Sequence, residues 1–283
     1  MSEFLDALRS PDVPAIRYAL IAGVLSSVAL GMIGTYVITR RISYIAGAIS
    51  HSVLGGIGAA LYVQVAWHCR WCDPMFGAVV AALASAVLIG GVSLRAKQRE
   101  DTVIGAIWSV GMATGLLFFA KTPGYVDPMS YLFGDILLLT RGDLICVFAL
   151  DALVIVLGMV FYNKFLAVCF DQEFAQLRGV RVNVYYILLL CLTALSIVIL
   201  LRVVGIVLVI ALVTLPAAVA GHFSRQLWQM MVLAVLACMV FTVAGLVVSF
   251  QTGLPCGPVI VMLAAATYLA VAVGGRLGKL RRG

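Results

Sequence analysis

A single histidine lies in the middle of the run GAISHSVLGGIG, residues 47–58. Residues four apart share one face of a helix, so on one face of this run the imidazole is almost the only side chain. A neutral imidazole can bind zinc, manganese or iron, and the glycines would leave space for an ion beside the ring. We therefore interpret His51 as a candidate metal ligand. The candidate residues lining an ion path beside it are Gly47, Ser50, Gly55 and Gly58. The alternative is a core histidine hydrogen-bonded to a neighbouring helix.

A second cluster of potential ligands lies in the stretch WHCRWCDP, residues 67–74. A C-x-x-C pair beside a histidine can bind zinc, and in an oxidising compartment it can form a disulfide. Three interpretations stay open: a disulfide or free thiols, an ordinary loop, and a metal entry site. The candidate ligands of an entry site are His68, Cys72 and Asp73.

The composition decides the setting of these residues. The 283-residue chain is 64% hydrophobic and 11% charged, with a mean hydropathy of +1.14. Soluble domains carry roughly 25% charged residues, and a soluble core could not bury this much apolar surface. The sequence therefore predicts an all-α polytopic membrane protein. An intramembrane enzyme is disfavoured, because adjacent helical residues such as Ser50 and His51 point in different directions and neither H-E-x-x-H nor G-x-S-x-G occurs.

A membrane span needs about 20 mainly apolar residues. We expect about nine spans, with eight or ten as alternatives because the region 121–142 is ambiguous. Pro216, inside an otherwise helical run, is expected to kink or break its helix. The expected spans are 17–38, 45–67, 75–94, 102–120, 143–162, 183–200, 203–221, 227–249 and 258–275.

The basic residues predict the orientation, because Lys and Arg accumulate in cytoplasmic loops. With the loop of Arg40 and Arg41 inside, 13 of the 19 Lys and Arg residues are cytoplasmic. The N-terminus is then external and the C-terminus cytoplasmic. We expect residues 1–16 to be an external amphipathic segment, 17–275 the transmembrane domain and 276–283 a basic cytoplasmic tail. The net charge of +7 reflects this bias, so no nucleic-acid partner is needed.

Four stretches of the chain, in this order and spacing, resemble the metal-ion ABC permeases that import zinc, manganese or iron. The resemblance implies a helical permease in a bacterial inner membrane that works as a dimer with a second copy or a paralogue. It also implies cytoplasmic ABC ATPase subunits and an external metal-binding protein. The stretches are RRISYIAGAISHSVLGGIGAAL, YLFGDILLLTRGDL, RVVGIVLVIALVTLPAAVAGHFSRQLW and TGLPCGPVIVMLAAATYLA.

The division of labour with an ATPase agrees with the sequence itself. No G-x-x-x-x-G-K-[ST] phosphate loop occurs, so we expect a transport subunit without enzyme activity that binds no permanent cofactor and uses ATP through a partner. The longest cytoplasmic loop, residues 163–182, can form a short helix that begins at Asp171 and ends before Gly179. Glu173, Ala175 and Gly179 fit the coupling-helix spacing of ABC importers, and Leu177 lies in the same segment. An ordinary capped surface helix is the alternative.

The chain departs from the family at Gly47. Relatives commonly read D-A-x-S-H, in which an aspartate lies four residues before the histidine. A divalent cation in a medium of low dielectric constant favours an anionic ligand, so another helix could supply the carboxylate. Asp151 is a candidate, because it lies roughly 12 Å from one membrane boundary while His51 lies roughly 15 Å from the other. The alternative for Asp151 is a structural hydrogen bond to a Thr or Ser on a neighbouring helix.

Two other kinds of transporter compete with the import of a metal ion. One is an ABC permease for a larger or chelated substrate such as haem or a siderophore, for which a missing carboxylate would be no loss. The other is a secondary cation transporter driven by protons or sodium, which would need several intramembrane acids. Asp151 is the only clear one.

Overall fold

The computed structural model describes residues 14–69, 71–95, 100–123 and 139–280. These residues form α-helices joined by short connections, and nine of the helices are long and apolar enough to cross a membrane. The prediction of an all-α chain with about nine spans is confirmed. The nine helices are α2 (Pro14–Arg40), α3 (Ser43–Ala66), α4 (Pro74–Arg95), α5 (Glu100–Lys121), α7 (Arg141–Val160), α10 (Val182–Val204), α11 (Ile206–Phe223), α12 (Leu227–Thr252) and α13 (Cys256–Leu280).

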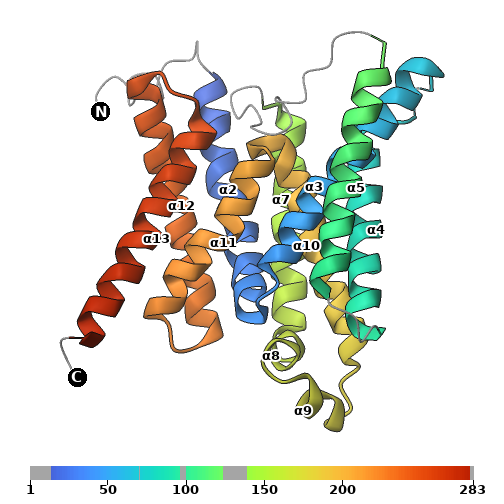
Figure 1. Ribbon diagram of the computed structural model, residues 1–283. Helices are drawn as coiled ribbons and strands as arrows, with labels where there is room; N and C mark the ends of the chain where they lie inside the picture. Colours follow the sequence, from blue (N-terminus) through green and yellow to red (C-terminus); the bar gives the residue numbers. More distant parts are fainter. Residues whose placement is uncertain (1–13, 70, 96–99, 124–138, 281–283) are drawn as a thin grey trace.

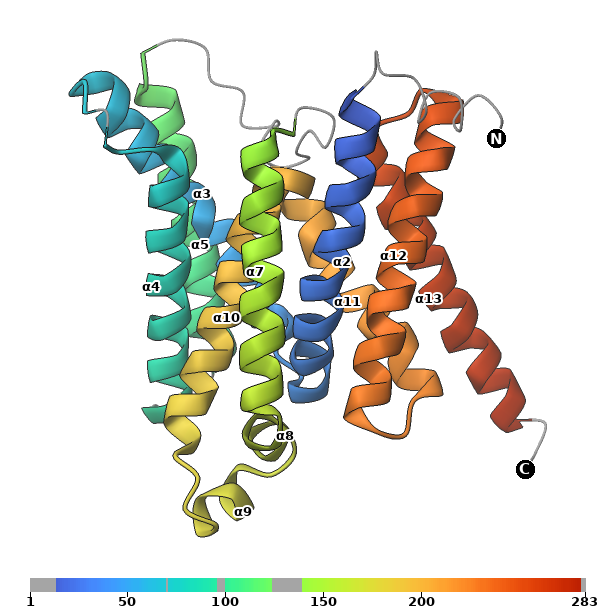
Figure 2. The same cartoon turned by 180° about the vertical axis from the view of Figure 1, so that it is seen from behind.

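The helices are arranged as two outer groups around a central one (Figures 1 and 2). α3, α4 and α5 pack together on one side, and α11, α12 and α13 pack together on the other. α2 contacts α7, α11 and α12, while α10 contacts both α4 and α2, so these two helices join the groups. Of the apolar stretch of α2, 67% is buried, against 11% for α13. The core therefore follows the central helices, and the outer faces of α5 and α13 are left for lipid or another chain.

Small residues make this core possible. Ala19, Ala22 and Ala29 on α2 are completely buried. Inside a bilayer the hydrophobic effect does not drive helices together, so close backbone approach through small side chains supplies the packing energy. Each helix satisfies its own backbone hydrogen bonds, which is the condition for crossing hydrocarbon.

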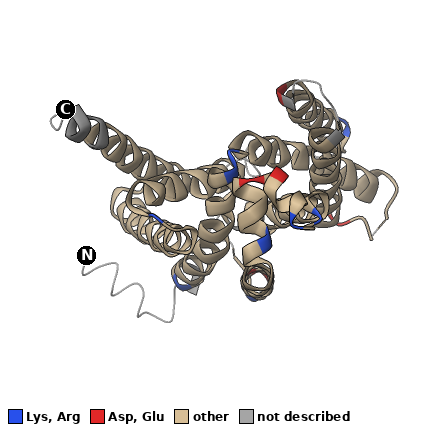
Figure 3. Cartoon of the chain, turned by 90° about the horizontal axis from the view of Figure 1, so that it is seen from below, with Lys and Arg blue, Asp and Glu red and all other residues tan. Residues whose placement is uncertain are grey.

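Two short helices, α8 (Tyr162–Phe170) and α9 (Gln172–Leu177), project from one end of the bundle. The last turns of α13 lie at the same end, and the start of α2 lies at the opposite end with the α3–α4 corner (Figures 1 and 2). Seen from the α9 end, Lys, Arg, Asp and Glu occupy only a few turns of the helices (Figure 3). The end that faces the cytoplasm is given by the basic residues alone and stays a prediction.

The helix that contains Pro216 is not broken there. α11 runs as one helix from Ile206 to Phe223, and Pro216 is buried inside it. The chain is interrupted instead at Gly205, whose φ of +81° lies in the region that L side chains avoid. Packing of α11 against α2, α12 and α13 holds both sides of the proline in helical conformation.

Some predictions fall outside the described residues. These are the amphipathic segment up to residue 13, the motif YLFGDILLLTRGDL up to residue 138, and residues 281–283 of the basic tail. The described part of that tail, up to Leu280, continues α13 as helix.

Candidate metal-transport site

The His51 imidazole on α3 stacks against the Trp108 indole on α5. The ring centroids are 4.5 Å apart and the ring planes differ by 15°. The Nδ1 atom of His51 is buried and has no hydrogen-bond partner among the described residues. His51 is therefore held by an aromatic contact, and a ring nitrogen that could bind a cation has no competing partner.

The same indole covers Gly47. A Cβ atom built on Gly47 would lie 3.1 Å from Cζ3 of Trp108, so a side chain there would push the ring away. Tyr44, on the first turn of α3, also contacts Trp108, with ring centroids 5.6 Å apart. We call Tyr44, Gly47, His51 and Trp108 the His51 cluster. In this cluster the Trp108 ring occupies the space beside position 47, where the resemblance to the metal-ion permeases implied an aspartate.

The glycines that follow His51 are in close contact with α5. A Cβ atom on Gly55 would lie 2.8 Å from the Gly111 carbonyl oxygen, and one on Gly58 would lie 2.7 Å from the Gly115 carbonyl oxygen. A Cβ on Gly111 would in turn meet the backbone of Ser52 at 2.5 Å. The expected space beside this stripe is thus filled by α5, and the glycines form a packing seam between the two helices.

Ser50 and Asp151 face other neighbours. The Ser50 hydroxyl is completely buried and donates to the Ala46 carbonyl within α3, at 2.9 Å. The Asp151 carboxylate is buried on α7, where Oδ1 accepts a hydrogen bond from the Ala29 N–H of α2 at 3.1 Å and Oδ2 has no hydrogen-bond partner in the described part of the chain. The carboxylate is thus directed at α2, whereas the His51 ring is directed at α5. The contacts do not support the idea that Asp151 replaces the carboxylate missing at Gly47.

His68, Cys72 and Asp73 do not gather into a metal-binding group in the described part of the chain. His68 and Asp73 are exposed and Cys72 is half-buried. Among the described residues, no group of three or more His, Cys, Asp and Glu side chains is placed to hold a metal ion. Within its described part, the chain therefore offers a cation single ligands such as His51 and no complete coordination sphere.

The predicted short helix in the 163–182 loop is confirmed as α9. The Asp171 side chain caps it by accepting from the Phe174 N–H at 2.9 Å. Gly179 has a φ of +76° and ends the segment. An acceptor at the N-cap and a glycine in the left-handed region are what a helix start and stop require.

One face of α9 is apolar and uncovered. Ala175 is buried against the rest of the molecule, whereas Leu177 is 87% exposed and Phe174 is 52% exposed. Phe170, at the end of α8, is also exposed. Large apolar side chains gathered at a projecting tip are typical of a protein–protein contact.

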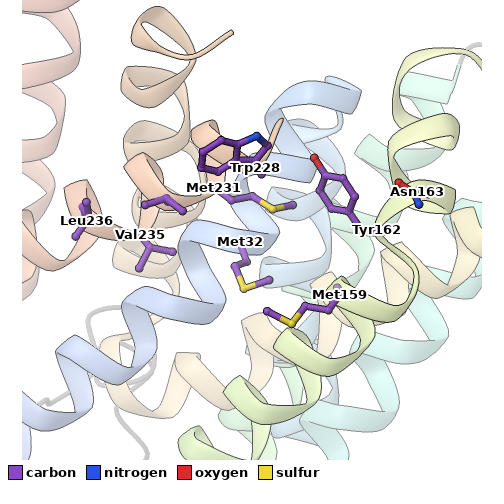
Figure 4. A pocket seen from close by; sticks show the side chains of 10 residues that line it. Met32, Met159, Tyr162, Asn163, Trp228, Met231, Val235 and Leu236 are labelled. Atoms are coloured by element: carbon purple, nitrogen blue, oxygen red, sulfur yellow. The ribbon is translucent and has the colours of Figure 1, made fainter. Parts of the chain in front are cut away.

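A groove of ≈680 Å³ lies between α2, α7, α8 and α12 (Figure 4). Three methionines line it, Met32, Met159 and Met231, with Tyr162 and Trp228 nearby. Neither α3 nor α5 contributes to its wall. The groove is therefore separate from the His51 cluster and does not extend it.

The similarity of the chain to known proteins completes this description. Residues 12–274 match the ABC 3 transport family. The chain belongs to this family of metal-ion ABC permeases. It is 39% identical to a protein of Chlamydia pneumoniae named "Probable metal transport system membrane protein", over 87% of this chain and 84% of that one. It is 31% identical to the manganese transport system membrane protein MntC of Halalkalibacterium halodurans, over 99% of this chain and 93% of that one.

A solved structure agrees with this membership. A chain in the structure of PsaBC from Streptococcus pneumoniae in complex with Fab superposes with a TM-score of 0.82 at 28% identity, covering 95% of this chain and 94% of that chain. The resemblance drawn from the four sequence stretches is confirmed.

The sequence pointed to His51 in this ABC 3 permease but not to the two aromatic side chains of the His51 cluster. Tyr44 lies seven residues before His51, so the spacing alone places the two aromatic rings on the same face of α3. Trp108 comes from another helix, and no local pattern connects it to His51. Only the packing of α3 on α5 reveals that contact.

Proposed function

We propose that this chain is the membrane-spanning subunit of an ATP-driven importer of divalent transition metal ions, located in a bacterial inner membrane. The observation that carries the proposal is a histidine within a membrane-spanning helix, with an unpartnered ring nitrogen, in a chain that matches the ABC 3 family over residues 12–274. Polar side chains at that depth are costly and by default indicate function.

His51 acts as a transient ligand in this proposal. A neutral imidazole gives the passing cation one donor, and the absence of a carboxylate at Gly47 keeps that contact weak. A transport path needs binding that is strong enough for entry and weak enough for exit. The remaining ligands come from water or from a second copy or paralogue of the permease. Because α5 packs directly against Gly55 and Gly58, this face of α3 can line an ion path only if α5 moves away from α3.

The motor is a separate chain. The absence of a phosphate loop means that ATP must be hydrolysed by partner subunits, and α9 is the element that would contact them. Exposed Phe174 and Leu177 would enter an apolar groove on the ATPase, while Glu173 gives a charged contact at the rim. An external metal-binding protein would deliver the cargo at the opposite end of the bundle.

The cargo is a transition metal ion, and two arguments point to different metals. Relatives of the chain are named for manganese, which makes Mn²⁺ the first candidate. Imidazole without carboxylate suits zinc or iron better than manganese. All three ions therefore belong in the test.

The test is uptake of radiolabelled Mn²⁺, Zn²⁺ and Fe²⁺ into proteoliposomes that contain the permease, its ATPase and its external binding protein. We expect uptake that needs ATP and that falls at least ~10-fold in His51→Ala, the lower end of losses caused by metal-site substitutions. His222→Ala is the matched control, because His222 is exposed at the end of α11 and its ring bonds the Ala218 carbonyl. Uptake without the ATPase would indicate a secondary transporter, and competition by a chelate but not by free metal would indicate a larger substrate.

A further inference from the structure

The corner between α3 and α4 must turn back on itself. Gly56 and Gly77 pack directly against each other across the two helices. Beyond Gly56, α3 continues for ten residues to Ala66, a rise of about 15 Å. On α4, only three residues separate Gly77 from the first residue, Pro74, a rise of about 5 Å. The connection, residues 67–73, therefore has to return by roughly 10 Å along the end of α3.

Two cysteines come close together on this return. The Cys72 N–H donates to the Cys69 carbonyl at 3.2 Å. A turn closed by this bond holds its first and fourth Cα atoms within about 7 Å, which overlaps the separation of about 4.4–6.8 Å that a disulfide needs. The Cys69 thiol, by a hydrogen bond, and then burial raise the pKa of Cys72, which agrees with two thiols that lie close together.

The remaining cysteines form no second C-x-x-C pair in the sequence. Cys146 is exposed on the membrane-spanning helix α7. Cys169 is buried in α8, where burial raises the pKa of its thiol to about 12. A thiol of that kind is protonated at neutral pH and reacts slowly.

We propose that Cys69 and Cys72, which the structure shows as free thiols, form an intramolecular disulfide that closes the α3–α4 corner on the outer side of the membrane. The proposal rests on the orientation that the basic residues predict, in which this corner lies opposite α8 and α9. It excludes the metal-entry interpretation of the pair, because a disulfide has no thiolate to bind a metal.

The oxidant is the disulfide of a thiol–disulfide oxidoreductase. The thiolate of one cysteine attacks that disulfide and forms a mixed disulfide, which expels one thiolate of the oxidoreductase. The second cysteine gives its proton to water and attacks the sulfur of the first, so the internal S–S bond forms and the oxidoreductase leaves as a dithiol. Two electrons pass to the oxidant. The raised pKa of Cys72 leaves little thiolate at neutral pH, so unassisted oxidation is slow and this exchange is needed.

The disulfide would act locally. It closes a ring of only four residues, so it constrains little of the unfolded chain. What it fixes is the turn at the end of α3, the helix that carries His51. We therefore expect it to order the corner and to have little influence on the stability of the whole bundle.

The test is differential alkylation of the full chain expressed in a bacterial host with an oxidising periplasm. Thiols are trapped in acid and blocked with N-ethylmaleimide under denaturing conditions. The chain is then reduced and labelled with a maleimide that adds mass on a gel. We expect two labels to appear only after reduction, and none in Cys69→Ser or Cys72→Ser. Cys146→Ser is the matched control and should keep both labels.

The outcomes separate this proposal from the transport proposal, because labelling needs no cargo. Absence of reduction-dependent label in the wild-type chain, with both cysteines blocked at the first step, would overturn the disulfide. So would a reduction-dependent label that persists in Cys69→Ser. Intact cells of Cys69→Ser treated with a membrane-impermeant maleimide should label Cys72 from outside, and protection of Cys72 there would overturn the outer location of the pair. None of these results changes what uptake measurements say about His51.

Discussion

The indole of Trp108 lies flat against the imidazole of His51 and at the same time closes the space above Gly47. One side chain from α5 thus meets both positions that define the D-A-x-S-H motif of relatives. The glycine and the tryptophan fit each other, because a Cβ atom at position 47 would lie 3.1 Å from the ring, which would then have to move by a few tenths of an ångström. We expect the residues at positions 47 and 108 to be coupled, because the Trp108 ring occupies the space that a side chain at position 47 would need.

A double-mutant cycle tests this pairing. Gly47→Asp alone should destabilise the permease by ~1–3 kcal/mol, the usual cost of overpacking. The effect should largely disappear when Trp108→Ala removes the ring, and the double variant should bind divalent metal more tightly because the site regains an anionic ligand. The measurements are the thermal midpoint of the purified protein and metal binding by calorimetry. Additive effects of the two substitutions would show that the positions are independent.

The glycine seam predicts a loss of packing at Gly55. In Gly55→Ala the new Cβ would lie 2.8 Å from the Gly111 carbonyl oxygen, which cannot rotate away, so α3 and α5 must separate. We expect a destabilisation of ~1–3 kcal/mol, measured as a lower thermal midpoint. Gly91→Ala on α4 is the matched control, because its Cβ would meet nothing within 4 Å, and alanine there should stabilise the helix by up to ~1 kcal/mol. A stable Gly55→Ala permease that no longer transports would instead indicate that this face lines the ion path.

Two variants of Asp151 distinguish a structural role of its carboxylate from a metal-binding role. Asp151→Asn keeps a carbonyl oxygen that can accept from the Ala29 N–H, so we expect nearly unchanged stability and uptake. Asp151→Leu removes the acceptor and should cost ~1 kcal/mol, the net value of one hydrogen bond. Thermal midpoints and metal uptake of both variants decide the matter. If the carboxylate is a ligand of the cargo, uptake in Asp151→Asn should fall as strongly as in His51→Ala.

If α9 contacts the ATPase, a variant of α9 should leave the ATPase hydrolysing ATP while no cargo is transported. Replacing Glu173 and Leu177 together by alanine removes an exposed charge and the most exposed apolar side chain of the tip. We expect the permease to insert normally and ATP hydrolysis by the partner to lose its dependence on cargo. Uptake and phosphate release are measured in the same proteoliposomes. Gln176→Ala is the matched control on the same exposed helix, and equal coupling in both variants would remove α9 from the ATPase interface.

The sequence by itself determined the class, the spans and the cap of α9. Each of these depends on residues close together in the chain: about 20 apolar residues for a span, and an acceptor and a glycine eight residues apart for α9. His51 stood out for the same local reason, as a polar side chain in an apolar run. The spans expected at 183–200 and 203–221 placed an interruption close to Gly205, where the structure has it, whereas the break expected at Pro216 does not occur because packing on both sides of Pro216 keeps α11 helical.

Only the tertiary structure decided what each helix faces. Within lipid the apolar faces of a helix are nearly equivalent in hydropathy, so the sequence does not fix the rotation of the helix about its axis. Close packing fixes it. The fit of Gly55 against Gly111 aligns α3 with α5, and this alignment places Trp108 on His51. In the same way, packing of α7 on α2 turns Asp151 to the Ala29 N–H, although its depth in the membrane had suggested His51 as its partner.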